Sequence, residues 1–156
     1  MTQSKVLEKI ETILTQNITR TAKAALIAEV IRAGGAYRWV GFYDVDVRKG
    51  LVSNVAWSGP SAPAFPTFPI TKGLTSRAIA TKTTVNVGDV ASDSSYLTAL
   101  ESTRSEIIVP VLDHTRDCVI GTIDVESMHL NAFDSASQAL LEEIARALAD
   151  FWAKRD

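Results

Sequence analysis

The sequence predicts an α+β fold, in which helices from both ends of the chain cover one face of an antiparallel sheet. Apolar residues recur at helical spacing near both ends, and two pairs of strand-like segments joined by short polar turns lie between them. Residues 58–104, which connect the two pairs, are left to cover the other face of the sheet. We expect a ligand pocket to form under this connection.

Two amphipathic helices are expected at the start of the chain. Apolar residues repeat every three or four positions in residues 4–15, and Ser4 is placed to cap the first turn. Residues 20–33 repeat the pattern up to Gly34-Gly35, where left-handed backbone is easily reached. We therefore expect this glycine pair to end the second helix.

Two β-hairpins are predicted from aromatic and β-branched segments. Residues 37–44 and 51–57 are separated by a turn that ends in Gly50, and residues 105–112 and 118–127 are separated by the polar turn DHTRD. Because two-stranded hairpins are marginal alone, we expect both to join one sheet.

The connection between the hairpins contains shorter elements. A proline-interrupted loop, 58–66, is long enough to cover a cleft, and a short helix at 74–81 and a strand at 84–86 follow it. Residues 92–100 are expected to contain one helical turn.

A long helix is predicted to close the chain from Asp134, which is a natural N-cap. One broad apolar stripe runs along it through Leu140, Leu141, Ile144, Leu148, Phe151 and Trp152. Because Trp152 lies near the chain end, and two-fold contacts are the commonest oligomer type, we expect a homodimer through the terminal helices.

Composition limits the classes of function. The 156 residues fit a single domain, 1–156, with a formal net charge of -2 and dispersed basic residues, so we expect no nucleic-acid partner. No apolar run approaches the roughly 18 residues of a membrane helix, and the polar start does not resemble a signal peptide. We expect no membrane association and a cytoplasmic location. The single cysteine, Cys118, and the two histidines provide neither an internal disulfide nor zinc-ligand spacing, so we expect no metal and no cofactor.

Three acids occupy strand positions, where acids are usually scarce. Asp124 and Glu126 are two residues apart and therefore share one face of a strand, together with Ile120 and Thr122. If that face met water, these acids would only keep the sheet soluble, and Glu106 could likewise be a solvated residue at a strand entry. From the residues alone, this explanation stays open.

Trp39 and Tyr43 also share one strand face, with Gly41 between them. A glycine there leaves room for a ligand between two aromatic walls, but simple core filling explains the two aromatics equally well.

Three strand motifs, in this order, carry a resemblance to a known family: Trp39-Val-Gly-Phe-Tyr43, Ser105-Glu-Ile-Ile-Val-Pro110 and Ile120-Gly-Thr-Ile-Asp-Val-Glu-Ser127. Over nearly its full length the chain resembles a GAF domain, and within that class it looks most like the free methionine-(R)-sulfoxide reductases. The resemblance implies a central antiparallel sheet with helices behind it and a small-molecule pocket in front.

The resemblance also implies roles for five residues. Trp39 and Tyr43 would line the pocket, and Glu106, Asp124 and Glu126 would contact a bound amino acid, with Glu126 standing where the family has Asp. Clustered, partly buried carboxylates raise one another's pKa unless a cation lies among them. Such a pocket would select an ammonium or guanidinium group and disfavour a phosphate.

The family's cysteines are missing from this chain. Sulfoxide reduction in the family needs a thiolate and a second thiol to resolve it, and the corresponding positions are Thr75, the region of Phe65, and Ala99. Cys118 follows a hairpin turn, where we expect an inert, partly buried thiol. We therefore expect the pocket to be kept and the reductase activity to be lost.

Three functions stay open on this basis. The first is a stand-alone sensor that binds a small cationic or zwitterionic molecule without catalysis. The second is a divergent free methionine-(R)-sulfoxide reductase, and the third is a dimerisation or interaction module whose pocket has closed. Cyclic-nucleotide binding rests on fold analogy alone.

Overall fold

The computed structural model describes residues 2–96 and 102–154. Its helices and strands follow the predicted order. They are α1 (Gln3–Leu14), α2 (Arg20–Gly35), β1 (Trp39–Asp46), β2 (Leu51–Ser58), β3 (Thr67–Pro69), α3 (Gly73–Thr81), β4 (Val85–Val87), the 3₁₀ helix η1 (Val90–Ser92), β5 (Ser105–Leu112), β6 (Val119–Ser127), α4 (Ser135–Ala147) and α5 (Ala149–Ala153). None of the described helices combines the length and the apolar character that crossing a membrane requires.

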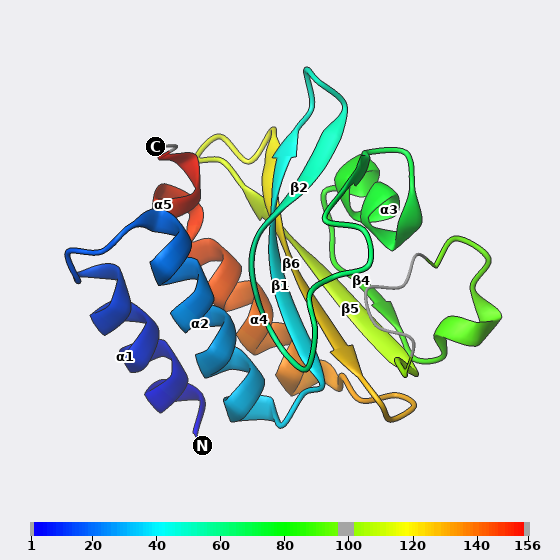
Figure 1. The fold of residues 1–156 in the computed structure, drawn as a ribbon, viewed down its shortest axis with the longest axis horizontal. Coiled ribbons are helices and arrows are strands. Elements are labelled where there is room, and N and C mark those ends of the chain that lie inside the picture. Colours follow the sequence, from blue (N-terminus) through cyan, green and yellow to red (C-terminus); the bar gives the residue numbers. More distant parts are fainter. Residues whose placement is uncertain (1, 97–101, 155–156) are drawn as a thin grey trace.

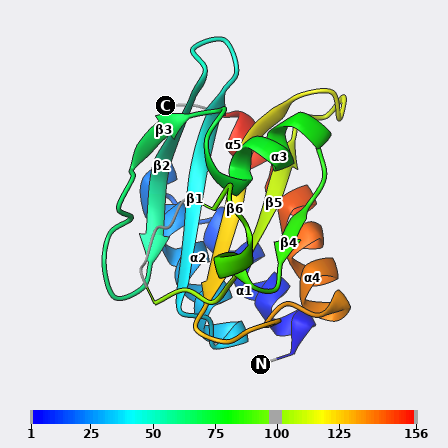
Figure 2. The ribbon, with the colours of Figure 1, turned by 90° about the vertical axis from the view of Figure 1, so that its right-hand side faces the viewer.

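The six strands form one antiparallel sheet in the order β3-β2-β1-β6-β5-β4. Both predicted hairpins are confirmed, and β1 and β6 pair at the centre. Helices α1, α2, α4 and α5 lie on one side of the sheet, whereas α3 and the connections around it lie on the other (Figures 1 and 2). The predicted α+β fold, with the end helices sharing one face, is therefore confirmed.

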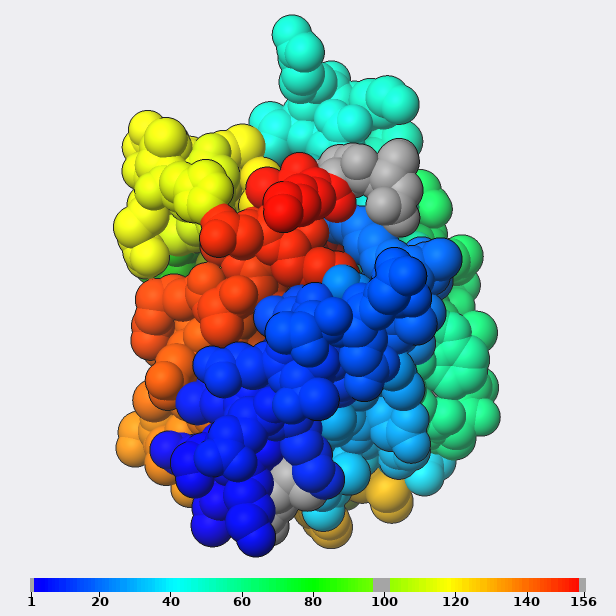
Figure 3. Space-filling view, turned by 90° about the vertical axis from the view of Figure 1, so that its left-hand side faces the viewer, coloured from blue at the N-terminus to red at the C-terminus, as the bar shows by residue number. Residues whose placement is uncertain are grey.

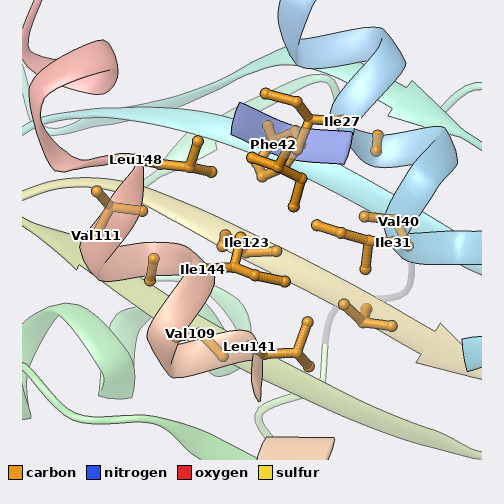
Figure 4. Packing of buried hydrophobic residues seen from close by; sticks show 14 of the residues in the cluster. Ile27, Ile31, Val40, Phe42, Val109, Val111, Ile123, Leu141, Ile144 and Leu148 are labelled. Atoms are coloured by element: carbon orange, nitrogen blue, oxygen red, sulfur yellow. The ribbon is translucent and has the colours of Figure 1, made fainter. Parts of the chain in front are cut away.

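The main core lies between the sheet and the end helices. Alternate residues of the central strands point toward this side, where they meet the apolar stripes of α2 and α4 (Figure 4). The contacting side chains include Ile27, Ile31, Val40, Phe42, Val109, Val111, Ile123, Leu141, Ile144 and Leu148. Figure 3 shows the outer surface of this layer, with α1 and α2 in blue beside α4 and α5 in orange to red.

The ends of the first two helices differ from the prediction. Thr2, not Ser4, caps α1 by accepting a hydrogen bond from the Lys5 backbone N–H. Helix α2 continues through Gly35, and the left-handed residue is Ala36, with φ 53°. Gly35 is instead needed for close packing, because a Cβ there would lie 2.1 Å from the Tyr37 ring.

The connection between the hairpins holds one strand that the sequence did not reveal. β3 is three residues long and pairs with the start of β2. The helical turn expected in 92–100 falls partly outside the described residues, which omit 97–101, and the described 3₁₀ turn η1 ends at Ser92.

The predicted closing helix begins as expected but divides in two. Asp134 caps α4 by accepting a hydrogen bond from Ser137 N at 2.8 Å, and Leu148 separates α4 from α5. Trp152 is fully buried in its own chain, and its indole N–H donates to the Tyr43 carbonyl at 3.3 Å. The expectation that Trp152 contacts a second copy of the chain is therefore wrong. The homodimer itself stays a prediction.

Gly121→Ala is expected to destabilise the protein by about 1–3 kcal/mol. The new Cβ would lie 1.8 Å from Trp152 Nε1, and that indole is buried and held by its hydrogen bond. Urea unfolding measures the effect. In a double-mutant cycle, Trp152→Phe should reduce the cost of the alanine, because it removes the crowded nitrogen. Independent, additive effects of the two substitutions would contradict the assigned clash.

Candidate functional site

The register of the central strands gathers the predicted acids on the sheet face opposite the main core. Glu126 of β6 lies directly beside Trp39 of β1 on one side and Glu106 of β5 on the other. Asp124, two residues before Glu126 on the same face of β6, lies beside Gly41 of β1. Directly opposed residues have Cβ atoms roughly 5 Å apart, so the sheet forces the three carboxyl groups into one small region.

A cavity of about 20 Å³ lies over these acids, between the sheet, α3 and the loop before β3. This is room for about one water molecule. The lining residues come from both layers. They are Tyr43, Phe65, Phe68, Gly73, Leu74, Thr75, Glu106, Asp124 and Glu126. Four of the five expected site residues therefore line one cavity, and Trp39 is not among its lining residues.

All three acids are removed from water. The exposed fraction is 4% for Glu106, 6% for Asp124 and 1% for Glu126. The explanation that they merely solvate an open sheet face is therefore wrong. Buried carboxyl groups are rare without partners because burial disfavours the charged form.

The acids differ in their hydrogen bonds. Glu126 Oε1 accepts from the Tyr96 hydroxyl at 3.2 Å and also from the Thr103 hydroxyl. By contrast, Asp124 Oδ1 and the Thr122 hydroxyl are buried without a hydrogen-bond partner among the described residues. Asp124 therefore keeps an acceptor available on the cavity side of the sheet.

Burial and mutual repulsion set the protonation of the cluster. Burial, and then the charges of Glu126 and Asp124, raise the pKa of Glu106 well above its usual range. Burial raises the pKa of Asp124 to about 8, and the charge of Glu126 adds to the shift. Burial and the three acids also raise the pKa of Tyr43. None of the described residues that line the cavity is basic, so Glu106 and Asp124 hold protons where a nearby cation would allow them to ionise.

The cluster is not arranged as a metal site. Across residues 2–96 and 102–154, no three His, Cys, Asp or Glu side chains are placed so that they could hold a metal ion. A ligand that interacts with these acids through several hydrogen bonds would suit them better than a single ion.

Ile120 does not share the face of Asp124, which corrects the expectation from strict alternation. The pairing of β5 with β6 shifts at Val111 and Leu112, where Leu112 pairs with Val119. This irregularity turns Ile120 toward the main core, while Val119 packs on the cavity side with Tyr43.

Trp39 fills the room that Gly41 was expected to leave for a ligand. A Cβ on Gly41 would lie 2.2 Å from the Trp39 ring, and one on Gly59 would lie 2.5 Å from it. The ring is fully buried between these glycines, and its indole N–H donates to the Ser61 carbonyl at 3.0 Å. Trp39 therefore anchors the loop after β2 to the sheet.

Two residues that the motifs did not single out position Tyr43. The pairing of β1 with β2 shifts between Phe42 and Tyr43, and the Asn54 side chain donates to the Phe42 carbonyl at 3.2 Å. On the other face, Trp152 donates to the Tyr43 carbonyl. A bulge changes the direction of the side chain beside it. Here the hydrogen bonds from Asn54 and Trp152 hold the backbone around Tyr43 in place. The sequence signal for the role of Asn54 was its polar side chain within the β2 segment, which also carries several apolar residues.

The positions that correspond to the family's cysteines can be located in part. Thr75 and Phe65 both line the cavity, and Ala99 lies outside the described residues. Cys118 is half-buried just before β6, where its thiol lies 3.8 Å from the Val119 carbonyl, and it does not line the cavity.

Comparisons with known proteins agree with this architecture. The family model described as GAF domain matches residues 14–153. The chain is 29% identical over 143 residues to GAF domain-containing protein A of Dictyostelium discoideum, which covers 92% of this chain and 87% of that protein.

Two solved structures are also similar. One is free methionine-R-sulfoxide reductase from Neisseria meningitidis in complex with its substrate, at 32% identity and TM-score 0.85 over 97% of this chain and 88% of that one. The other is a type II free methionine-R-sulfoxide reductase from Thermoplasma acidophilum, at 30% identity and TM-score 0.79 over 85% and 92%. With the sheet, the helical layer and the family match in agreement, the chain belongs to the GAF domain family.

Proposed function

We propose that this GAF domain binds a small molecule with an ammonium or similar cationic group, of the amino-acid or amine class, and acts as a sensor without catalysis. The observation that carries the proposal is the meeting of Glu106, Asp124 and Glu126 in one buried cavity, with no basic residue among the described residues of its lining. An ammonium group would supply the missing positive charge and up to three hydrogen-bond donors.

The remaining walls suit the carbon part of such a ligand. Tyr43 and Phe68 pack edge to face, with ring centroids 5.7 Å apart, and Phe65 closes the cavity from the loop side. Aromatic faces attract cations as well as apolar groups. The combination of acids on the sheet and aromatics around them favours an amine attached to a short side chain.

Ligand entry requires the outer wall to move. The cavity holds about one water molecule, so an amino acid fits only after Phe65 and the start of α3 shift outward. Phe65 is 45% exposed and belongs to the loop that precedes β3. This partial exposure makes Phe65 the wall residue with the least packing to lose when the cavity opens.

The chain lacks the thiols for a complete reductase cycle at this site. Reduction of a sulfoxide to a sulfide and water oxidises two thiols to a disulfide. The sequence has one cysteine, Cys118, and it is not among the residues lining the cavity. The names of the Neisseria and Thermoplasma relatives support amino-acid-like ligands for the pocket, and the missing thiols argue against turnover.

A thermal-shift screen tests the binding proposal. The panel is L-methionine, its free (R)-sulfoxide, L-lysine, L-arginine and n-butylamine. A bound amine should raise the melting temperature in proportion to the logarithm of its concentration. Glu106→Gln should abolish the rise, whereas Glu143→Gln, an exposed acid on α4, should keep it. Equal responses from the two variants would place the binding site elsewhere.

Loss of reductase activity is a separate prediction. In a coupled NADPH-oxidation assay with free methionine-(R)-sulfoxide, the protein and its Cys118→Ser variant should both show only background rates. Turnover that disappears with Cys118→Ser would support the divergent reductase instead. Turnover that persists in the variant would point to an external thiol acting at the pocket.

A dimerisation or interaction module is the second candidate, and the small cavity favours it. Trp39 fills the space beside Gly41. Under this function, the acid cluster lines a pocket that has closed and no longer binds a ligand. This function predicts no thermal shift with any amine. It also predicts that a homodimer through the terminal helices survives Glu106→Gln, which sedimentation equilibrium would measure.

A further inference from the structure

A second hollow of about 370 Å³ lies at one end of the sheet, where α2 leads into β1. The turn after β6 and the loop after β2 complete its walls (Figure 1, lower edge of the sheet). Three of its residues carry basic side chains: Arg32, Arg38 and His129. No Asp or Glu is among the described residues that line it, so its charge is opposite to that of the acidic cavity.

Arg38 is the most unusual of the three. Its backbone N–H donates to the Glu126 carbonyl at 3.0 Å, which holds the residue beside β6, immediately before the start of β1. Its Nε is buried and has no hydrogen-bond partner among the described residues. A buried donor that belongs to a permanent cation is costly to leave unpaired. Because Arg38 lines the hollow, an anion there would compensate the charge of its guanidinium.

Arg32 adds a second guanidinium from the last turn of α2. Its Nε donates to the Ser58 hydroxyl at 2.8 Å, which orients the group and leaves its terminal nitrogens available. His129 follows β6, and its backbone N–H donates to the Ser127 hydroxyl at 3.1 Å, which fixes the turn. The hollow therefore combines two guanidinium forks with an imidazole on short, tethered segments.

We propose that this basic hollow binds a small oxyanion, the phosphate or carboxylate group of a metabolite. Guanidinium forks match the geometry of both groups and bind them through paired, charge-assisted hydrogen bonds. The volume of about 370 Å³ accommodates a group of this size together with part of its parent molecule. Among the described residues, the two linings have no member in common, so the oxyanion site and the amine proposal can be tested separately.

NMR titration of the whole chain with inorganic phosphate, and separately with succinate, tests this inference. Ionic strength is held constant with sodium chloride, so that general screening does not contribute. The expected result is saturable shifts of the Gly59, Ser127 and His129 amides. Saturation with phosphate alone identifies a phosphoryl ligand, and saturation with succinate alone identifies a carboxylate ligand.

Two matched substitutions decide the site. Arg38→Gln should weaken binding by about tenfold or more, because a charge-assisted pair is lost. Arg48→Gln removes the same charge from the exposed β1–β2 turn and should leave binding unchanged. If Arg38→Gln does not fold, Arg32→Gln replaces it with the same expectation. Non-saturating shifts with both anions, or equal affinities in the Arg38 and Arg48 variants, would overturn the inference.

Discussion

Asp124→Asn is expected to stabilise the protein by several kcal/mol at about pH 8 and by little at about pH 4. Burial and Glu126 raise the pKa of Asp124 to about 8 in the folded chain. A carboxyl group with a raised pKa binds its proton more tightly when folded. Its contribution to stability is therefore complete below the unfolded pKa, near 4, and is lost as the pH rises through about 8. Asparagine carries no charge to bury, so the variant escapes this loss.

Urea unfolding at a series of pH values measures the effect as the difference between the two proteins. Acids outside the cluster also change stability with pH, but they are common to both proteins and cancel in the difference. The pKa of Glu106 responds to the charge of Asp124, so Glu106 contributes to the difference as part of the same cluster. Asp117→Asn, at an exposed acid in the β5–β6 turn, is the matched control. A difference that does not grow with pH would show that Asp124 is not held protonated by burial.

The affinity for an amine is expected to rise by roughly 50-fold between pH 6 and pH 8. At the lower pH a carboxyl group with a pKa of about 8 is almost fully protonated, and a neutral acid attracts an ammonium group weakly. At the higher pH about half of it is ionised, while the amine itself stays protonated. Binding should therefore strengthen with pH and release protons.

Isothermal calorimetry in two buffers with different ionisation enthalpies measures both the affinity and the protons released. In Asp124→Asn the pH dependence should be weaker, because the carboxyl group with a pKa of about 8 is gone while the raised pKa of Glu106 still contributes. The thermal-shift response of Glu143→Gln provides the control for charge removed elsewhere. A neutral or anionic ligand would give a flat or falling affinity across the same range.

Local patterns predicted the elements of this fold well. The continuous apolar run of β5 was located at both ends, and Asp134 was identified as a cap, because such runs and caps depend on neighbours in the chain. β3 escaped prediction because a strand of three residues that follows one proline and ends in another carries too little pattern. The end of α2 was misplaced because the role of Gly35 depends on the ring of Tyr37, not on its own backbone.

The acids of the site could be predicted, and their environment could not. The two-residue spacing placed Asp124 and Glu126 on one face, but only the pairing of β5 with β6 sets Glu106 opposite Glu126. The burial of Trp39 between two glycines and the contact of Tyr96 with Glu126 join segments far apart in the chain. Such contacts are decided by tertiary packing, which single-sequence patterns do not report.

The most direct test of the central claim compares amines with their N-acetyl derivatives. Calorimetry at about pH 8 would measure L-methionine, its free (R)-sulfoxide and n-butylamine beside their N-acetyl forms, which keep the parent side chain and carry no positive charge. If the acidic cavity selects a cation, at least one free amine binds and its N-acetyl form loses about tenfold or more in affinity, with Glu106→Gln removing the difference. Equal binding of both forms, or no binding by any amine, would contradict the claim.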